Sequence, residues 1–186
     1  MKVKGSAVLT IPLFISRQFG EGEQKRWFDS LPEDSKEIFA SPILVSSWYP
    51  LKYALSEPTH KLCELFYNGD VKGAWENGRF SAAYGLKGVY KVFIKIASPQ
   101  FLIKKASSIL PAYYEPCTIV ASEEGKNGAS VRITRFPEID EVVENRMGGW
   151  IEQALEICGC EEIQISRTKS LLNDDACTEF QVSWRI

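Results

Sequence analysis

The single histidine of the chain, His60, is considered first because imidazole serves as a general base, a metal ligand or a haem ligand. It falls in segment 57–67, which its apolar spacing predicts to be helical. On that helix His60 points away from the apolar face that contains Leu62, and it lies beside Glu57 and Glu64. A haem ligand should point into an apolar pocket, and a zinc site needs further ligands nearby. The sequence therefore predicts an exposed histidine without a ligand role.

Five cysteines are the next candidates for chemistry. Cys158 and Cys160 are separated by one residue, whereas zinc knuckles and redox motifs separate their cysteines by two. Cys117 and Cys177 fall in predicted strands, where a thiol packs as a small apolar group, and nothing near Cys63 points to a reaction. An odd cysteine count argues against a closed disulfide framework and favours a reducing compartment. We expect no metal site and a cytoplasmic location.

The polar cluster Glu76-Asn77-Gly78-Arg79 has two interpretations. Glu76 and Arg79 are three residues apart on a predicted helix, so they can pair on its surface. Alternatively, the planar guanidinium of Arg79 faces a carboxylate or phosphate of a ligand. The sequence contains no serine-nucleophile elbow and no glycine-rich phosphate loop, and no pair of its carboxylates can be nominated for acid–base work. We expect a protein that is not an enzyme.

The composition is that of an ordinary globular protein. The chain has 186 residues, of which 45% are hydrophobic and 25% are charged, and its formal net charge is −2. This charge gives no electrostatic footprint for nucleic acid. The N-terminal apolar stretch 7–15 is interrupted by Pro12 and followed by Arg17, which favours a core element over a secretion signal. No segment approaches the roughly 18 apolar residues that a membrane span requires.

Helical periodicity dominates the first part of the chain. Helices are expected from about Thr10 to Gly20, over 21–30, after Pro32, from a Ser56 cap to Asn68-Gly69, over 71–86, over 89–97, and from Ser98-Pro99 to about Leu110. In the helix over 71–86, Gly78 and Ala82 are small enough to let a neighbouring helix approach closely. The proline-bounded segment 41–50 is apolar and is predicted to be a buried connection.

The period changes to two from Cys117 onward, which predicts strands. Strands over 117–122 and 129–134 are separated by Asn127-Gly128, a signal for a tight hairpin turn. An amphipathic helix follows, with Asp140 as its cap and a soft point at Gly148-Gly149. Its apolar face consists of Val143, Met147, Trp150, Ala154 and Cys158.

Two further strands complete the pattern. Ile163 and Ile165 mark the first of them, and the turn-forming segment 171–176 follows it. The last strand places Phe180, Val182, Trp184 and Ile186 on one face and polar residues on the other. We therefore expect an α+β fold, in which an N-terminal helical part packs on a four-stranded antiparallel sheet made of hairpin, helix and hairpin. The chain is expected to form a single domain over 1–186, with the helical part at 1–111 and the sheet part at 112–186.

Aromatic residues gather between the helical part and the first strand, and a subset of them can line an apolar cavity between helices and sheet. The predicted lining residues are Trp48, Tyr49, Trp75, Tyr84 and Tyr90, with Arg79 as an anchor for a polar group. Such a site would hold a small apolar or amphipathic molecule.

This order of elements resembles the superfamily that unites haem nitric-oxide-binding domains, 4-vinyl-reductase-type small-ligand-binding domains and TRAPP vesicle-tethering subunits. The motifs RQFGEGEQKRWFDSLP, SSWYPL, ENGRFSAAYGLKGVYKVFIKIASPQFL and YYEPCTIV are more closely similar to an uncharacterised bacterial family of about this length that is abundant in myxobacteria. The resemblance spans nearly the whole chain.

The resemblance implies a small-ligand-binding fold, but the haem motifs of the superfamily do not carry over. Haem members have a proximal histidine on a helix shortly before the sheet and a Tyr-x-Ser-x-Arg motif in the first hairpin. Here segment 71–110 contains no histidine, and the matching hairpin reads SVRITRF. We therefore expect no cofactor, and haem in particular is not expected.

The sequence thus predicts a non-catalytic binding or sensor domain with a signalling or regulatory role. TRAPP members dimerise through helices, so the resemblance also implies a homodimer. The alternative is a dimeric interaction or scaffold protein without a ligand, and the third possibility is a haem-based gas sensor. No nucleic-acid partner is expected.

Overall fold

The computed structural model describes residues 1–86 and 98–185. The elements of the first stretch are β1 (Lys2–Lys4), α1 (Gly5–Val8), α2 (Thr10–Phe19), α3 (Glu21–Ser30), α4 (Glu33–Phe39), β2 (Trp48–Pro50), the π-helical turn η1 (Lys52–Ser56), α5 (Glu57–Tyr67) and α6 (Lys72–Gly85). The helix predicted over 89–97 lies outside the described residues.

The second stretch contains the large sheet. Its elements are α8 (Pro99–Ile109), the 3₁₀ turn η2 (Leu110–Ala112), β3 (Tyr114–Glu115), β4 (Thr118–Glu123), β5 (Gly128–Arg135), α9 (Glu141–Ile157), β6 (Glu161–Lys169), the 3₁₀ turn η3 (Leu171–Asn173) and β7 (Thr178–Arg185). The strand order in the large sheet is β4-β5-β7-β6, and every neighbouring pair is antiparallel. The predicted hairpin, helix and hairpin are therefore confirmed.

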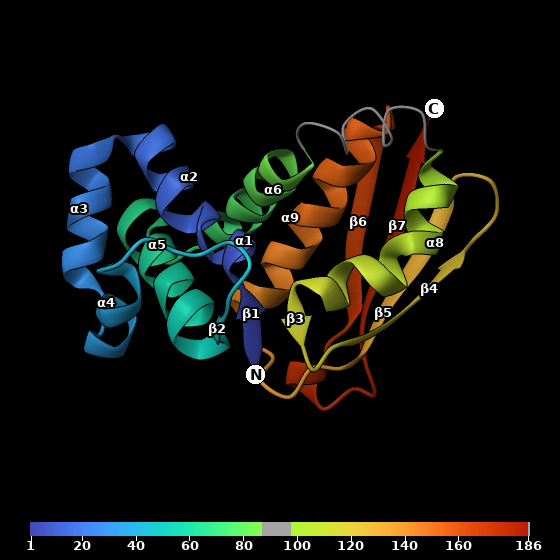
Figure 1. Cartoon of the computed structure of the whole chain (residues 1–186). Helices are drawn as coiled ribbons and strands as arrows, with labels where there is room; N and C mark the ends of the chain where they lie inside the picture. Colours follow the sequence, from blue (N-terminus) through green and yellow to red (C-terminus); the bar gives the residue numbers. More distant parts are fainter. Residues whose placement is uncertain (87–97, 186) are drawn as a thin grey trace.

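The alternation of β7 produces one buried face, as predicted. Phe180, Val182 and Trp184 are at most 4% exposed, and Val131 and Ile133 of the neighbouring β5 share that face. Figure 1 shows α9 and α8 against this sheet, with the remaining helices on the far side of α9. The sheet therefore forms one outer layer, and α9 forms part of the middle layer.

The structure contains a second, three-stranded sheet with the order β2-β1-β3, which the sequence did not predict. Val3 pairs with Tyr49 on one side and with Tyr114 on the other. Each of these strands has only two or three residues, too few to display a period of two. Their pairing partners also lie far apart along the chain, so only the tertiary fold brings them together.

The segment before β2 differs from its prediction as a buried connection. Leu44 and Val45 are 62% and 53% exposed. The backbone of this segment contacts α1, because the Ser6 N–H donates to the Val45 carbonyl at 3.0 Å. Leu44 and Val45 therefore lie on the surface, where single apolar side chains are common in folded proteins.

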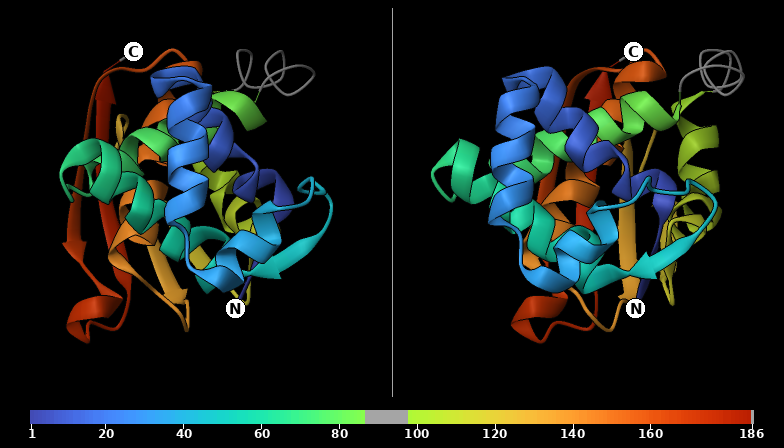
Figure 2. Two further views of the ribbon diagram at one scale, coloured as in Figure 1. Left: turned by 90° about the vertical axis from the view of Figure 1, so that its left-hand side faces the viewer. Right: turned by 60° about the vertical axis from the view of Figure 1, so that its left-hand side comes forward.

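The two ends of α5 illustrate what a cap signal specifies. Asn68 takes the left-handed conformation, with φ of 54°, and ends α5 where predicted. Ser56, in contrast, makes no cap hydrogen bond, because η1 runs into α5 without a break. Figure 1 shows α5 in the helical layer, on the other side of α6 and α9 from the large sheet, and Figure 2 shows the helical layer turned toward the viewer.

Candidate functional site

The crossing of α6 and α9 brings the two layers together and sets the geometry of the interior. A Cβ atom on Gly78 would lie 2.0 Å from the Arg146 carbonyl oxygen, and one on Gly149 would lie 2.0 Å from the Trp75 carbonyl oxygen. The predicted close approach at Gly78 is thus confirmed. Gly148 faces the ring of Trp75, so the glycine pair is a contact surface in α9.

Arg79 lies at this crossing among carboxylates of α9. Its guanidinium donates to Glu152 and, at 2.8 Å, to Glu156, while the Trp75 indole N–H donates to Glu152 at 2.7 Å. Glu76, the partner that the helical spacing indicated, is 4.0 Å from Arg79 and is the weaker contact. The structure therefore gives Arg79 two partners from its own chain.

The other predicted lining residues lie apart from one another. Trp48 and Tyr49 are in β2, where the Lys4 ammonium lies 4.5 Å from the Trp48 ring centre and the Tyr49 hydroxyl accepts from the Leu44 N–H at 2.9 Å. Tyr84 stacks on Phe80 within α6. Tyr90 lies outside the described residues. Their role in binding, with that of Trp75 and Arg79, stays a prediction.

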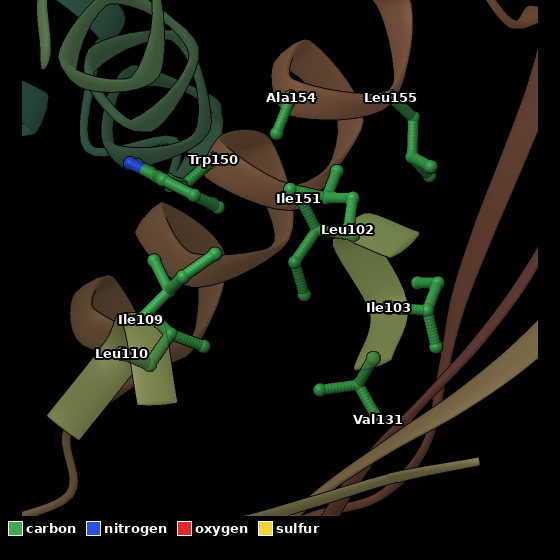
Figure 3. A pocket seen from close by; sticks show the side chains of 9 residues that line it. All are labelled: Leu102, Ile103, Ile109, Leu110, Val131, Trp150, Ile151, Ala154 and Leu155. Carbon is green, nitrogen blue, oxygen red and sulfur yellow. The ribbon is translucent and has the colours of Figure 1, made fainter. Parts of the chain in front are cut away.

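Two interior cavities lie beside α9. The first, of about 20 Å³, is wholly apolar and lies between α8, α9 and β5 (Figure 3). Its lining residues are Leu102, Ile103, Ile109, Leu110, Val131, Trp150, Ile151, Ala154 and Leu155. Each residue comes from the apolar face of its element, which explains why the cavity carries no polar group.

The second cavity, of about 10 Å³, differs because a charged side chain reaches it. It is lined by Ala7, Ser81, Leu110, Tyr113, Tyr114, Arg146, Met147 and Trp150. Leu110 and Trp150 also line the first cavity, so these two side chains separate the apolar space from the polar one.

Arg146 is a buried charged residue that the sequence interpretation did not select. It is 2% exposed although it carries a positive charge. Its Nη2 donates to the Ala7 carbonyl at 2.9 Å, to Thr10 Oγ1 at 2.9 Å and to Ser81 Oγ at 3.2 Å. A signal was present in the sequence, because Arg146 lies four residues before Trp150 on the face predicted to be apolar.

A second buried charge in α9 has a structural role. Glu144 is fully buried and accepts from the Ser170 hydroxyl at 2.9 Å, from the Thr178 hydroxyl, and from Arg167 Nη1 at 2.6 Å. Arg167 and Thr178 belong to β6 and β7. The carboxylate therefore joins the start of α9 to the large sheet.

His60 lies on the surface, but its partner differs from the predicted pair of carboxylates on its own helix. Its Nε2 lies 3.0 Å from both carboxylate oxygens of Asp140, and the side chain is 53% exposed. Asp140 caps α9 as predicted, accepting from the Val142 N–H at 2.9 Å. The pair therefore joins α5 to the N-terminus of α9.

This pair predicts a pH-dependent contribution to stability. The hydrogen bond to Asp140 raises the pKa of His60 above its ordinary value of 6.5. Stability from the pair is therefore fully present below about pH 6.5 and is lost as the pH rises through the folded-state pKa. Because the ring is half-exposed, we expect His60→Gln to lower the free energy of unfolding by only about 0.5 kcal/mol near pH 6 and by almost nothing near pH 9.

Denaturant unfolding of both proteins at the two pH values measures this difference. Lys61→Gln, which removes an exposed pair with Glu64 on the same helix, serves as the control. An equal loss for His60→Gln at both pH values would contradict the assignment.

The cysteines lack reactive surroundings. Burial raises the pKa of Cys63 and of Cys158 to about 11, and that of Cys117 to about 12. Burial also raises the pKa of Cys160 to about 12. These groups are therefore thiols at neutral pH and are weak nucleophiles. Over 1–86 and 98–185, no three histidine, cysteine or acidic side chains gather as a metal site would require.

A helical layer, α6 and α9 at the centre, and a hairpin-helix-hairpin sheet define the fold of the H-NOX proteins, the haem nitric-oxide-binding domains. The chain is similar to an H-NOX protein from S. oneidensis in the Fe(II)NO ligation state, with 14% identity and a TM-score of 0.76, over 98% of this chain and 99% of that one. An Fe(II) unliganded H-NOX protein from K. algicida has 11% identity and a TM-score of 0.71, over 98% and 97% of the two chains.

A third solved structure with this fold is a mutant of the T. tengcongensis H-NOX, with 12% identity, a TM-score of 0.67 and 98% coverage of both chains. No family model and no curated protein sequence matches the chain. The fold that the resemblance to the haem nitric-oxide-binding domains implied is therefore confirmed.

The expectation of no cofactor is wrong in the light of this comparison. The solved structures of this fold are H-NOX proteins in Fe(II), Fe(II)NO and Fe(II)CO ligation states, which points to haem as the group associated with the fold. The sequence interpretation relied on the missing motifs and gave too little weight to the fold itself.

The side chains of this chain nevertheless do not fit a histidine-ligated haem. The chain has one histidine, and it lies on the outer side of α5 bound to Asp140. The two cavities beside α9 are each about the size of one water molecule. A haem held in this interior would therefore need a ligand other than imidazole, and the two cavities would have to widen to admit it.

In the part of the chain that the structure describes, no helix combines the length and the apolarity needed to cross a membrane.

Proposed function

We propose that this chain is a ligand-binding sensor domain whose ligand lies inside the fold, between α6, α9 and the segment formed by η2 and β3. The observation that carries the proposal is the interior cavity beside Arg146, where a buried charged group has hydrogen-bonding capacity to spare. The ligation states of the solved H-NOX proteins support a small ligand and a sensing role. The interior position also supports a signalling role, because a ligand there contacts both α6 and α9 close to the point where the two helices cross.

Native mass spectrometry of the gently purified protein, followed by haemin titration monitored by absorbance, tests the proposal. We expect one bound molecule per chain, either carried through purification or taken up as haemin. Ala7→Val should reduce uptake at least tenfold, because Ala7 lines the cavity and is 3% exposed. Gly22→Ala, where a Cβ would meet no atom within 4 Å, is the control and should leave uptake unchanged.

Two outcomes would overturn the proposal. One is a protein that folds but takes up neither haemin nor any other molecule, which would favour the scaffold alternative. The other is uptake that Ala7→Val and Gly22→Ala leave equally unchanged, because binding would then lie outside the interior. The homodimer and the cytoplasmic location stay predictions; the odd cysteine count supports the second of them.

A further inference from the structure

Arg146 has an arrangement of partners that is unusual for a buried charge. The three acceptors of its Nη2 are a backbone carbonyl and two hydroxyl groups, all of them neutral. Its Nη1 is buried and has no hydrogen-bond partner among the described residues. A buried arginine is normally paired with an anion, because an unpaired charge in a low-dielectric interior is strongly destabilising.

The described residues supply no counterion for this guanidinium. None of the carboxylates over 1–86 and 98–185 forms a salt bridge with Arg146, and the sequence of 87–97, KGVYKVFIKIA, contains no acidic residue. Tyr114 is a further hydrogen-bond partner of the guanidinium, but it is a neutral one, because burial raises the pKa of its phenol above the ordinary value of 10. Burial lowers the pKa of the Arg146 guanidinium below its ordinary value. Arginine nevertheless stays protonated in proteins, so the positive charge persists.

The surroundings of Arg146 define the rest of the ligand. Beyond Leu110 and Trp150 lies the apolar cavity between α8, α9 and β5, whose surface is apolar and whose lining side chains are aliphatic apart from Trp150 (Figure 3). A molecule that moved these two side chains apart would therefore contact the Arg146 guanidinium at one end and apolar side chains of the protein along its length. A planar carboxylate matches the fork of a guanidinium in both charge and shape.

We propose that the ligand is an amphipathic monocarboxylate, whose carboxylate accepts hydrogen bonds from Arg146 Nη1 while its apolar body lies along Leu110 and Trp150 in the apolar cavity. This inference rests on the interior ligand site proposed above and adds the chemical class of the ligand. It also accounts for a charge without a counterion on the apolar face of α9.

Isothermal titration calorimetry of the full chain with straight-chain monocarboxylates, the corresponding primary alcohols and the methyl esters tests the assignment. The acids should bind at least tenfold more tightly than the alcohols or esters of equal length. Affinity should rise about fourfold per methylene group until the alkyl chain fills the apolar cavity. This comparison uses only the wild-type protein, so it does not depend on the folding of a variant.

Three variants extend the test. Arg146→Met keeps the length and apolar volume of the side chain, and should bind acids at least tenfold more weakly while it binds alcohols as well as or better than the wild type does. Arg146→Lys keeps the charge without the fork and should lie between the two. Arg132→Met removes an exposed arginine of β5 and is the matched control, with unchanged affinities.

The outcomes separate this inference from the site on which it rests. Equal binding of acids, alcohols and esters, all reduced by Ala7→Val, would keep the interior site and overturn the carboxylate assignment. Failure of every probe to bind, in a protein that takes up another molecule in the native mass spectrum, would also overturn the assignment alone. Failure of all uptake would overturn both.

Discussion

Gly78→Ala is expected to lower the free energy of unfolding by about 3 kcal/mol, or the melting temperature by roughly 10 °C. The added Cβ would lie 2.0 Å from the carbonyl oxygen of Arg146 and 2.8 Å from its carbonyl carbon. Both are backbone atoms of α9, so the clash cannot be relieved by rotation of a side chain. The two helices must move apart, and the interior between them opens.

Gly22→Ala is the matched control for this substitution. Gly22 is also helical, but its Cβ would meet no atom within 4 Å, so the better helix propensity of alanine should raise stability by about 0.5–1 kcal/mol. Thermal and urea unfolding measure both changes. A small and equal effect of the two substitutions would show that α6 and α9 do not cross as closely as described.

Arg167→Met should lower the free energy of unfolding by about 3 kcal/mol, because it leaves the Glu144 carboxylate buried with only hydroxyl donors. The substitution removes the 2.6 Å hydrogen bond between Arg167 Nη1 and Glu144, whose side chain is 0% exposed. Arg167 is one-third exposed and solvent screens part of the pair, so the expected loss lies at the low end for a buried ion pair.

Arg185→Met provides the control for this prediction. Arg185 pairs with Glu162 at 2.7 Å, but both side chains are more than 60% exposed, so its removal should change stability by less than about 0.5 kcal/mol. Urea denaturation of the two variants gives the comparison. Similar losses for Arg167→Met and Arg185→Met would mean that Glu144 is not the buried anchor of α9.

The sequence predicted the large sheet and its helix well because each element carries its own periodic signal. β7 alternates strictly over eight residues, and the Asp140 cap marks the start of α9. The sheet β2-β1-β3 could not be found in this way, since its strands are too short to show a period. The Ser56 prediction failed because a cap residue is also compatible with the interior of a continuous helical segment.

The candidate site was only partly accessible from the sequence. The spacing in α9 places Arg146 on the apolar face, and this conflict between charge and position is a signal of function. Its acceptors, however, come from α1, α2 and α6, and no local pattern links Ala7, Thr10 and Ser81 to a residue more than 60 positions away. Arg79 illustrates the reverse case, since its carboxylate partners lie in α9, beyond the reach of helical spacing within α6.

A crystal structure of the chain with a medium-chain monocarboxylate tests the central claim most directly. We expect electron density for the carboxylate within hydrogen-bonding distance of Arg146 Nη1, and density for the apolar chain between Leu110 and Trp150. An acid bound only on the outer surface, with the guanidinium still unpaired inside a closed interior, would contradict the account.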